Sequence, residues 1–445
     1  MITAKLRVYL LAACAALAAC DDPAGGGGGG TTGDPVEIVR NAAHPLTGAA
    51  ADYDPLMSAI GESRFVLLGE ATHGTHEFYT QRARISRRLI EERGFAAIVV
   101  EAEYPAARRV HAYLQGRGDP SPEAALAGFT EFPLWMWRNA EVRDFLRDLR
   151  ALNAASPGRV TFVGMDVYSL YASQDDVIAY LSRVDPAAAA RARTRYACFA
   201  PYGRDPQEYG SEAAGTPAAS CATQAAEQLA EMQQRAASAP ADPELFDAVQ
   251  SARVVRGAEE FYRRNFQPGE GAWNARDRHM AETLTALAAH LEARGQRGRI
   301  AVWAHNSHVG DARATEMGAR GQLTVGQLMR QRNPNETFLL GFTTFEGEVV
   351  AATSWGAPGR STALRQALPE SYAALFHQTG VPSFLLVLRG SPAAPALSDS
   401  RLERAVGVVY APQTERQSHY FQARLAEQFD AVIHIDRTTA VSPLP

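Results

Sequence analysis

LLGEATHGTHEFYTQR (residues 67–82) and VWAHNSHVG (residues 302–310) each begin as a hydrophobic strand and end in ionisable side chains. In open α/β sheets, ligands bind outside the carboxyl ends of the strands, because loops and helix N-termini converge there on a shared crevice. Two strands that end in this way therefore predict a functional site. The candidate site residues in the two stretches are Glu70, His73, His76, Glu77, Arg82, His305 and His308.

The same pattern occurs in four apolar runs. FVLLG (65–69) precedes Glu70, AAIVV (96–100) precedes Glu101, VTFVGM (160–165) precedes Asp166 and IAVWA (300–304) precedes His305. Polar residues also mark loops, so any one of these endings can be no more than the end of a strand. Taken together, the endings favour a set of side chains gathered at one edge of a sheet.

Hydrophobic periodicity gives the architecture around these runs. Helices are predicted over residues 76–93, 106–115, 141–153, 276–294, 323–330 and 417–428. Further strands are predicted over residues 337–343, 384–388, 406–410 and 431–435. Strands that alternate with helices predict an α/β fold, with a mostly parallel or mixed central sheet flanked by helices.

Residues 184–266 differ from the rest of the chain, because they are rich in Ala, Arg, Gln and Glu and contain no strand run. They predict a helical insertion. Its position between the Asp166 and His305 strands would allow it to lie over the carboxyl edge of the strands as a lid, although a helical bulge remote from the site fits equally well.

The chain has 445 residues, of which 46% are hydrophobic and 21% charged, so it can bury a large core. The formal net charge is −5, and without Lys5 and Arg7 of the expected signal it has 42 basic against 49 acidic residues. An acidic balance of this kind makes nucleic acid an unsuitable partner.

The N-terminus is predicted to be an export signal. Lys5 and Arg7 precede an apolar stretch at residues 8–17, and Leu17-Ala18-Ala19-Cys20 matches the lipobox of bacterial lipoproteins. This stretch is too short to span a bilayer comfortably, which takes about 20 residues. A plain secretory signal cleaved after Ala19 is the alternative.

These features divide the chain into a signal peptide (1–19), a glycine-rich tether (20–34) and a folded domain (35–445), whose expected chemistry is derived below. A glycine run at residues 25–30 makes the tether flexible. The expected location is the bacterial cell envelope, with the domain anchored to the membrane on the periplasmic side by lipid on Cys20.

Cys198 and Cys221 remain as an even pair in a protein that is expected to be exported, which favours a disulfide. Two independent buried thiols are the alternative. A catalytic thiol is disfavoured, because neither cysteine lies in a motif with histidine.

The chemistry that these residues support is hydrolysis. Glu70 and His73 stand three residues apart where the strand gives way to a helix, so both can face one site. A histidine that titrates near neutrality can remove a proton from water, and a neighbouring carboxylate fixes its tautomer and raises its basicity. Arg82 can neutralise carboxylates or bind an anionic group.

Other hydrolase types lack their motifs here. The chain contains neither the Gly-x-Ser-x-Gly of the common serine hydrolases nor the His-Glu-x-x-His of zinc peptidases. His73-x-x-His76 and His305-x-x-His308, with Glu70 and Glu101, offer enough ligands for a divalent metal. Asn306 and a nearby arginine suit a hydrogen-bonding site as well as they suit coordination, and we expect neither metal nor cofactor.

Five runs carry a resemblance to a known family. LLGEATHGTHEFYTQR, IVVEAEYP (98–105), VTFVGMDVYS (160–169), WNARDRHMAE (273–282) and VWAHNSHVG, in this order and at these separations, resemble the erythromycin esterase family over residues 37–441. Characterised members of that family hydrolyse the macrolactone ring of macrolide antibiotics. The resemblance implies an ester or lactone as substrate, an α/β fold with a helical insertion, and a metal-independent reaction in which histidine activates water.

The resemblance also implies roles for single residues. His73 is the expected general base, Glu70 orients it, and Arg82 and Glu101 line the same cleft. His305 or His308 would polarise the carbonyl or protonate the leaving alcohol. Glu77 and Asp166 are predicted to contribute to substrate binding, although the role of Asp166 and of Asp277 can be structural. His76 lies outside the resemblance, because its place in the family pattern is variable, and it is a secondary candidate for substrate binding.

A second class of function stays open. Related lipoproteins with a similar Gly-Glu-x-x-His strand end bind heme or act as metal-dependent peptidases. An envelope lipoprotein that binds heme or metal, or a metal-dependent hydrolase, is therefore the alternative.

Overall fold

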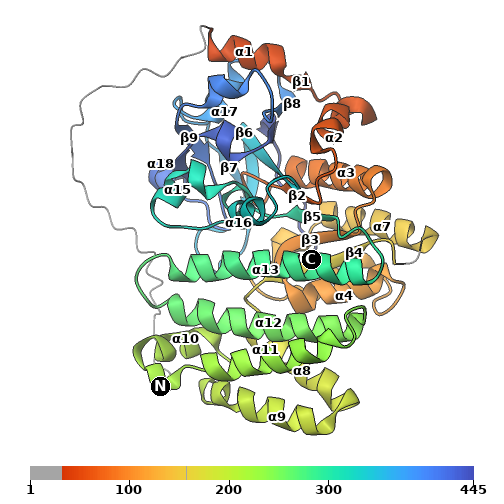
Figure 1. The fold of residues 1–445 in the computed structure, drawn as a ribbon. Helices are drawn as coiled ribbons and strands as arrows, with labels where there is room; N and C mark the ends of the chain where they lie inside the picture. The colour runs from red at the N-terminus through yellow and green to blue at the C-terminus, as the bar shows by residue number, and fades with distance from the viewer. Residues whose placement is uncertain (1–32, 157) are drawn as a thin grey trace. The chain divides into compact units, whose positions relative to one another are not determined.

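The computed structural model describes residues 33–156 and 158–445, in which helices flank a nine-stranded sheet (Figure 1). The predicted signal peptide, Cys20 and nearly all of the tether lie outside the described residues. The strands are β1 His44–Pro45, β2 Phe65–Leu68, β3 Ala97–Glu103, β4 Thr161–Asp166, β5 Ile300–Trp303, β6 Thr337–Ala351, β7 Arg360–Leu364, β8 Ser383–Val387, β9 Arg401–Arg404, β10 Tyr420–Ala423 and β11 Ala431–Thr438.

Helices connect and cover these strands. They are α1 Pro35–Ala42, α2 Asp54–Ile60, α3 His76–Arg93, α4 Tyr104–Leu114, α5 Pro122–Leu126, α6 Leu134–Trp137, α7 Ala140–Ala155, α8 Leu170–Val184, α9 Pro186–Tyr196, α10 Pro206–Gly215, α11 Ala222–Ala237, α12 Pro243–Arg264, α13 Gly271–Ala293, α14 Asn306–Val309, α15 Glu316–Ala319, α16 Val325–Arg332, α17 Tyr372–His377, α18 Glu415–Ser418 and α19 Leu425–Gln428. In the described part of the chain, none of the helices combines the length and apolar character needed to cross a membrane.

The sheet is mixed, with the strand order β1-β8-β11-β6-β2-β5-β3-β4 and β7 paired to β6. The run from β11 to β4 is parallel throughout, whereas β8 pairs antiparallel with β11. This confirms the predicted α/β class. It also brings the carboxyl ends of β2, β5, β3 and β4 together at one edge, where Glu70, His305, Glu101 and Asp166 stand.

Both faces of the parallel strands are covered, as is usual for strands that read as continuous apolar runs. Val66 and Leu68 of β2 pack in one core cluster with Trp303 and residues of α3, while Phe65 and Leu67 pack in the opposite cluster with residues of α13. Alternate residues of β2 therefore face opposite core clusters, and a shift of one residue in strand pairing would exchange the two sets.

Two predicted elements are wrong. Residues 406–410 form only isolated bridges, from Val406 to Thr72 and from Val409 to Ala352. The predicted helix over 417–428 is broken by β10, which pairs antiparallel with β9. In both places the backbone finds hydrogen-bond partners that are distant in sequence, which local periodicity does not reveal.

The helical insertion starts earlier than predicted, at α8, and has its own apolar core. Figure 1 shows α12 lying alongside α13, with α8, α9 and α11 beyond it on the side away from the sheet. The insertion therefore extends the α13 layer. It touches the border of the candidate site through Tyr262, whose hydroxyl donates to the Tyr168 carbonyl at 3.0 Å.

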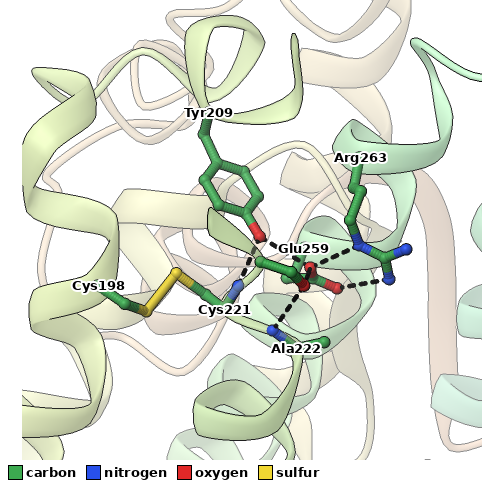
Figure 2. The surroundings of a disulfide bond; sticks show 7 residues. Cys198, Tyr209, Cys221, Ala222, Glu259 and Arg263 are labelled. Carbon is green, nitrogen blue, oxygen red and sulfur yellow. Dashed lines mark hydrogen bonds and ion pairs between the residues drawn. A yellow bond between two sulfur atoms is a disulfide. The ribbon is translucent and has the colours of Figure 1, made fainter. Parts of the chain in front are cut away.

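A disulfide joins Cys198 to Cys221 within the insertion, with the two Cα atoms 6.0 Å apart (Figure 2). Beside it, the Tyr209 hydroxyl accepts from the Cys221 N–H at 3.0 Å and donates to Glu259 Oε1 at 2.7 Å. Arg263 neutralises the buried Glu259, since its Nε donates to Glu259 Oε1 at 2.8 Å. The disulfide and this polar network together fix the segment before α11 against α12.

Candidate active site

Glu70, His73 and Arg82 form a buried triad behind the carboxyl end of β2. Glu70 Oε1 lies 2.8 Å from His73 Nδ1, and Glu70 Oε2 accepts from Arg82 Nη2 at 2.7 Å. Glu70 and Arg82 are both fully buried, and His73 is 6% exposed. A buried carboxylate needs a countercharge, and Arg82 supplies it to Glu70.

Arg82 is enclosed by aromatic rings. Its guanidinium carbon lies 4.5 Å from the Tyr79 ring centroid and 4.8 Å from that of Trp303. Its Nε and Nη1 have no hydrogen-bond partner among the described residues. Arg82 therefore positions Glu70 from behind, and the structure does not place it where it would line a cleft.

The hydrogen bond to Glu70 sets the tautomer of His73. An ionised carboxylate can only accept, so Nδ1 carries the proton and Nε2 keeps its lone pair. Within residues 33–156 and 158–445, no group hydrogen-bonds Nε2 of His73, whereas His305 and His308 have partners at both ring nitrogens. His73 thus offers the ring nitrogen that can accept a proton.

His305 lies beside His73, with the ring centroids 4.8 Å apart. Its Nδ1 accepts from the Ser307 N–H at 3.2 Å, so the proton is on Nε2, which lies 3.2 Å from the Ala71 carbonyl oxygen. Burial, together with His73, lowers the pKa of His305 well below its ordinary value. His305 is therefore a neutral ring that packs against His73 and the β2 loop.

Glu101 links the two halves of the site. Its Oε2 accepts from the His305 N–H at 2.9 Å, and its Oε1 accepts from Arg276 Nη2 at 2.7 Å. Burial alone would raise the pKa of Glu101, but His308, Arg276 and His73 lower it well below the usual range. The register of β3 against β4 shifts between Val100 and Glu103, which is a common way to redirect a side chain beside a site.

Arg276 of α13 is the cationic centre of the second half. Its Nε and Nη2 donate to the two carboxylate oxygens of Asp166 at 2.9 and 2.6 Å, and Nη2 also donates to Glu101. The guanidinium carbon lies 5.1 Å from the Tyr168 ring centroid. One arginine therefore compensates the charges of two buried carboxylates from different strands.

His308 closes this network. Its Nε2 lies 2.8 Å from Arg276 Nη1 and 3.4 Å from Glu101 Oε1, and its Nδ1 lies 3.0 Å from both oxygens of Asp277. Since a guanidinium only donates, the Arg276 contact requires a neutral His308 with its proton on Nδ1. Burial opposes protonation of His308, but Asp277 and Glu101 raise its pKa. A protonated His308 would donate from Nε2 to Glu101 in place of accepting from Arg276.

The structure does not bring His76 and Glu77 into this cluster. His76 Nδ1 lies 2.7 Å from Glu141 Oε1, and Glu77 accepts from the Thr439 N–H and hydroxyl. Both face the C-terminal segment from the first turn of α3. Asp166 is 2% exposed and committed to Arg276, so its position fits the structural role better than direct contact with a substrate.

Two important residues were not among the candidates. Arg276 stands beside Asp277 in the WNARDRHMAE run, and Trp273 of the same run stacks on His308 with ring centroids 4.4 Å apart. The WNARDRHMAE run was the feature of the sequence that could have identified both residues. Within the described ranges, no group of three or more His, Cys, Asp and Glu residues is arranged to hold a metal ion.

The family described as erythromycin esterase matches residues 90–438, which include every site residue from Glu101 to His308. The chain belongs to the erythromycin esterase family. The match begins after Glu70, His73 and Arg82, so these three residues are placed by the structure and by their own sequence.

One curated relative is an erythromycin esterase type II of Escherichia coli, which is 28% identical over 116 residues, or 26% of each chain. The chain thus matches about a quarter of that relative. A Bacillus cereus protein of known structure has a TM-score of 0.78 at 21% identity, covering 92% of this chain and 98% of that one.

Two other solved structures share the fold. A succinoglycan biosynthesis protein has a TM-score of 0.73 at 22% identity, covering 92% of this chain and 97% of that one. A mutant of the erythromycin esterase EreC in its open conformation has a TM-score of 0.64 at 17% identity, covering 87% and 93%. At these identities the likeness shows the fold alone.

The Arg276 network predicts a large stability effect. Arg276→Met should lower the free energy of unfolding by about 3–5 kcal/mol, because it leaves Asp166 and Glu101 buried without their countercharge. Urea denaturation followed by circular dichroism measures this. Arg278→Met is the matched control, since Arg278 is exposed on the same helix, and it should change stability by less than about 0.5 kcal/mol.

Adding Asp166→Asn to Arg276→Met should recover part of the loss, because it removes one of the two uncompensated charges. Equal stabilities for Arg276→Met and Arg278→Met would contradict the assignment of Arg276 as the cation of the site.

Proposed function

We propose that the protein is a carboxylic ester hydrolase in which His73 activates the attacking water. The observation that carries the proposal is the free Nε2 of His73, opposite the Nδ1 that Glu70 holds. This is the arrangement that general-base catalysis requires, because the proton acceptor must have an available lone pair and a fixed orientation. Family membership supports ester hydrolysis as the reaction class.

In this mechanism, His73 Nε2 removes a proton from water as the water oxygen forms a bond to the ester carbonyl carbon. The carbonyl π electrons move onto oxygen and give a tetrahedral oxyanion. When the carbonyl re-forms, the bond from carbon to the alcohol oxygen breaks. His73 then returns its proton to the leaving alkoxide, so one water is consumed and one acid and one alcohol are released.

We assign the oxyanion to Arg276, with His308 accepting from it and so holding it in position. They share a hydrogen bond at 2.8 Å, and Arg276 is the cation of the cluster. Arg82 and His305 are less suitable for this role. Arg82 has no exposed surface, and the Nε2 of His305 is directed at the Ala71 carbonyl. A preorganised donor at an oxyanion typically contributes about 3 kcal/mol to the barrier.

For the substrate we propose an ester or lactone, with the macrolactone of a macrolide as the first candidate. The support is the name of the matched family and of the Escherichia coli relative. Because that relative is matched over about a quarter of its length, its whole activity is a proposal for this chain.

We also propose that the enzyme is a lipoprotein of the bacterial cell envelope, anchored through lipid on Cys20. The Cys198–Cys221 disulfide supports an oxidising compartment. Cys20→Ser should move the protein from the membrane pellet to the soluble fraction of the cells in which it is expressed. A protein that remains equally membrane-bound after this substitution would refute the lipid anchor.

The role of His73 predicts a selective loss of activity. His73→Ala should lower kcat for ester hydrolysis by about 10²- to 10⁴-fold, the usual contribution of a general base. His76→Gln is the matched control, because His76 lies three residues away and outside the cluster, and it should retain wild-type turnover. Mass spectrometry of erythromycin incubated with each protein, with and without chelator, detects the addition of one water.

A folded His73→Ala protein with wild-type turnover would end this proposal, with folding checked by circular dichroism. Loss of wild-type activity in chelator would instead favour the metal-dependent hydrolase.

A further inference from the structure

Large apolar side chains are exposed at few positions in the described residues, and two of them lie in or directly next to loops that face each other. Trp355 is 49% exposed in the loop of residues 352–359, between β6 and β7, and Leu134 is 40% exposed at the start of α6. Phe132, in the loop of residues 127–133 before α6, lies with its ring centroid 5.0 Å from that of Trp355. We call Phe132 and Trp355 the aromatic pair.

The two loops that carry the aromatic pair are fixed to each other. Trp135 is buried and packs on Gly359 so closely that a Cβ there would lie 2.3 Å from Trp135 Cδ1. At its other end, the segment is held to α3, because the Tyr79 hydroxyl donates to the Met136 carbonyl at 2.9 Å. The exposed Trp355 and the half-buried Phe132 are therefore carried on anchored backbone.

The loop of residues 352–359 begins beside His73. Gly74, the next residue, accepts at its carbonyl from the Val350 N–H at 3.0 Å, and a Cβ on Gly74 would lie 2.0 Å from the Val350 oxygen. The His73 N–H donates to the Val406 carbonyl, and two residues further the Val408 carbonyl accepts from the Ala352 N–H at 2.9 Å. Trp355 is three residues from this contact, so it lies within about 11 Å of Ala352 along the chain.

The loop of residues 127–133 packs against the triad side of the site. The Phe129 ring centroid lies 6.2 Å from that of Trp137, and the Trp137 centroid lies 6.4 Å from that of Tyr79, the ring beside Arg82. Phe132 is three residues from Phe129, so this loop joins the packing around Arg82 to Trp355.

We propose that Phe132 and Trp355 are specificity-determining residues that bind the apolar ring body of a large cyclic ester while its carbonyl reaches His73. The inference rests on the proposed hydrolase function and assigns two substrate-binding residues to it. Flat aromatic faces give a large contact area at little entropic cost, and they suit a ring with many C–H groups.

The size of the aromatic pair favours a small molecule over a protein. Stable protein interfaces bury more than about 1,000 Å², whereas the exposed apolar surface here is limited to a few side chains. Its backbone is also continuous with the residues around His73. A substrate bound at the pair would therefore extend from the site outward, and a small acyclic ester would not reach it.

The test compares two substrates, erythromycin and p-nitrophenyl acetate, in Trp355→Ala and Phe132→Ala. Loss of an aromatic anchor should lower kcat/KM for erythromycin about 10- to 30-fold more than kcat/KM for p-nitrophenyl acetate, mainly through KM. Trp355→Phe should recover most of the loss. Val184→Ala is the control, because Val184 is 53% exposed at the far end of α8, and it should leave both values unchanged.

Equal effects on the two substrates, or no effect on either, would overturn the proposal. So would a wild-type protein that hydrolyses p-nitrophenyl acetate and leaves erythromycin intact, although the hydrolase function would then stand.

If the wild type hydrolyses neither ester, the proposed function fails, and calorimetric titration of erythromycin into the protein decides the role of the pair. Binding that weakens at least tenfold in Trp355→Ala and not in Val184→Ala supports the aromatic pair. Absent binding, or equal binding in both variants, overturns it.

Discussion

The hydrogen bond between Glu70 and His73 is the interaction on which the proposed chemistry of this protein depends. It fixes which ring nitrogen holds the proton and leaves the other with its lone pair. The bond in turn depends on Arg82, whose charge would be costly to bury without Glu70, just as Glu70 would be without Arg82. The apolar and aromatic packing around β2, α3 and β5 therefore serves to hold one histidine in one tautomer.

The second half of the site obeys the same constraint with more charges. Glu101, Asp166 and Asp277 are all buried; Arg276 is the cation that compensates Glu101 and Asp166, and the His308 ring donates to Asp277. The two halves meet at Glu101, which accepts from the His305 backbone and from Arg276. Because His308 Nε2 accepts from Arg276 only in the neutral ring, protonation of His308 would end this hydrogen bond.

Much of the fold could be predicted from the sequence, because the signals were local. The helix over residues 76–93 has the predicted bounds, and all four apolar runs that end in Glu70, Glu101, Asp166 and His305 are parallel strands. The predicted strand at 406–410 and the predicted helix at 417–428 were wrong. These segments pair with Thr72, Ala352 and β9, which lie far away along the chain. Periodicity carries no information about such pairings.

In the candidate site, too, residues close together in the sequence were predicted and partners far along the chain were missed. Glu70 and His73 are neighbours in the sequence and were predicted together, whereas Arg276 binds Asp166 from 110 residues away and was missed. His76 and Glu77 were included because they follow His73 closely, but α3 begins at His76, and helical rotation turns both side chains towards Thr439 and Glu141. The position of a residue in a motif did not determine which way its side chain points.

The central claim, that His73 presents an unprotonated Nε2, can be measured directly. Nitrogen-15 NMR of protein labelled at histidine, with the His73 signals assigned by comparison with His73→Gln, reports the protonation of each ring nitrogen. At the pH of activity, we expect a protonated Nδ1 and an unprotonated Nε2. A proton on Nε2 in the resting enzyme would contradict the assignment of His73 as the base.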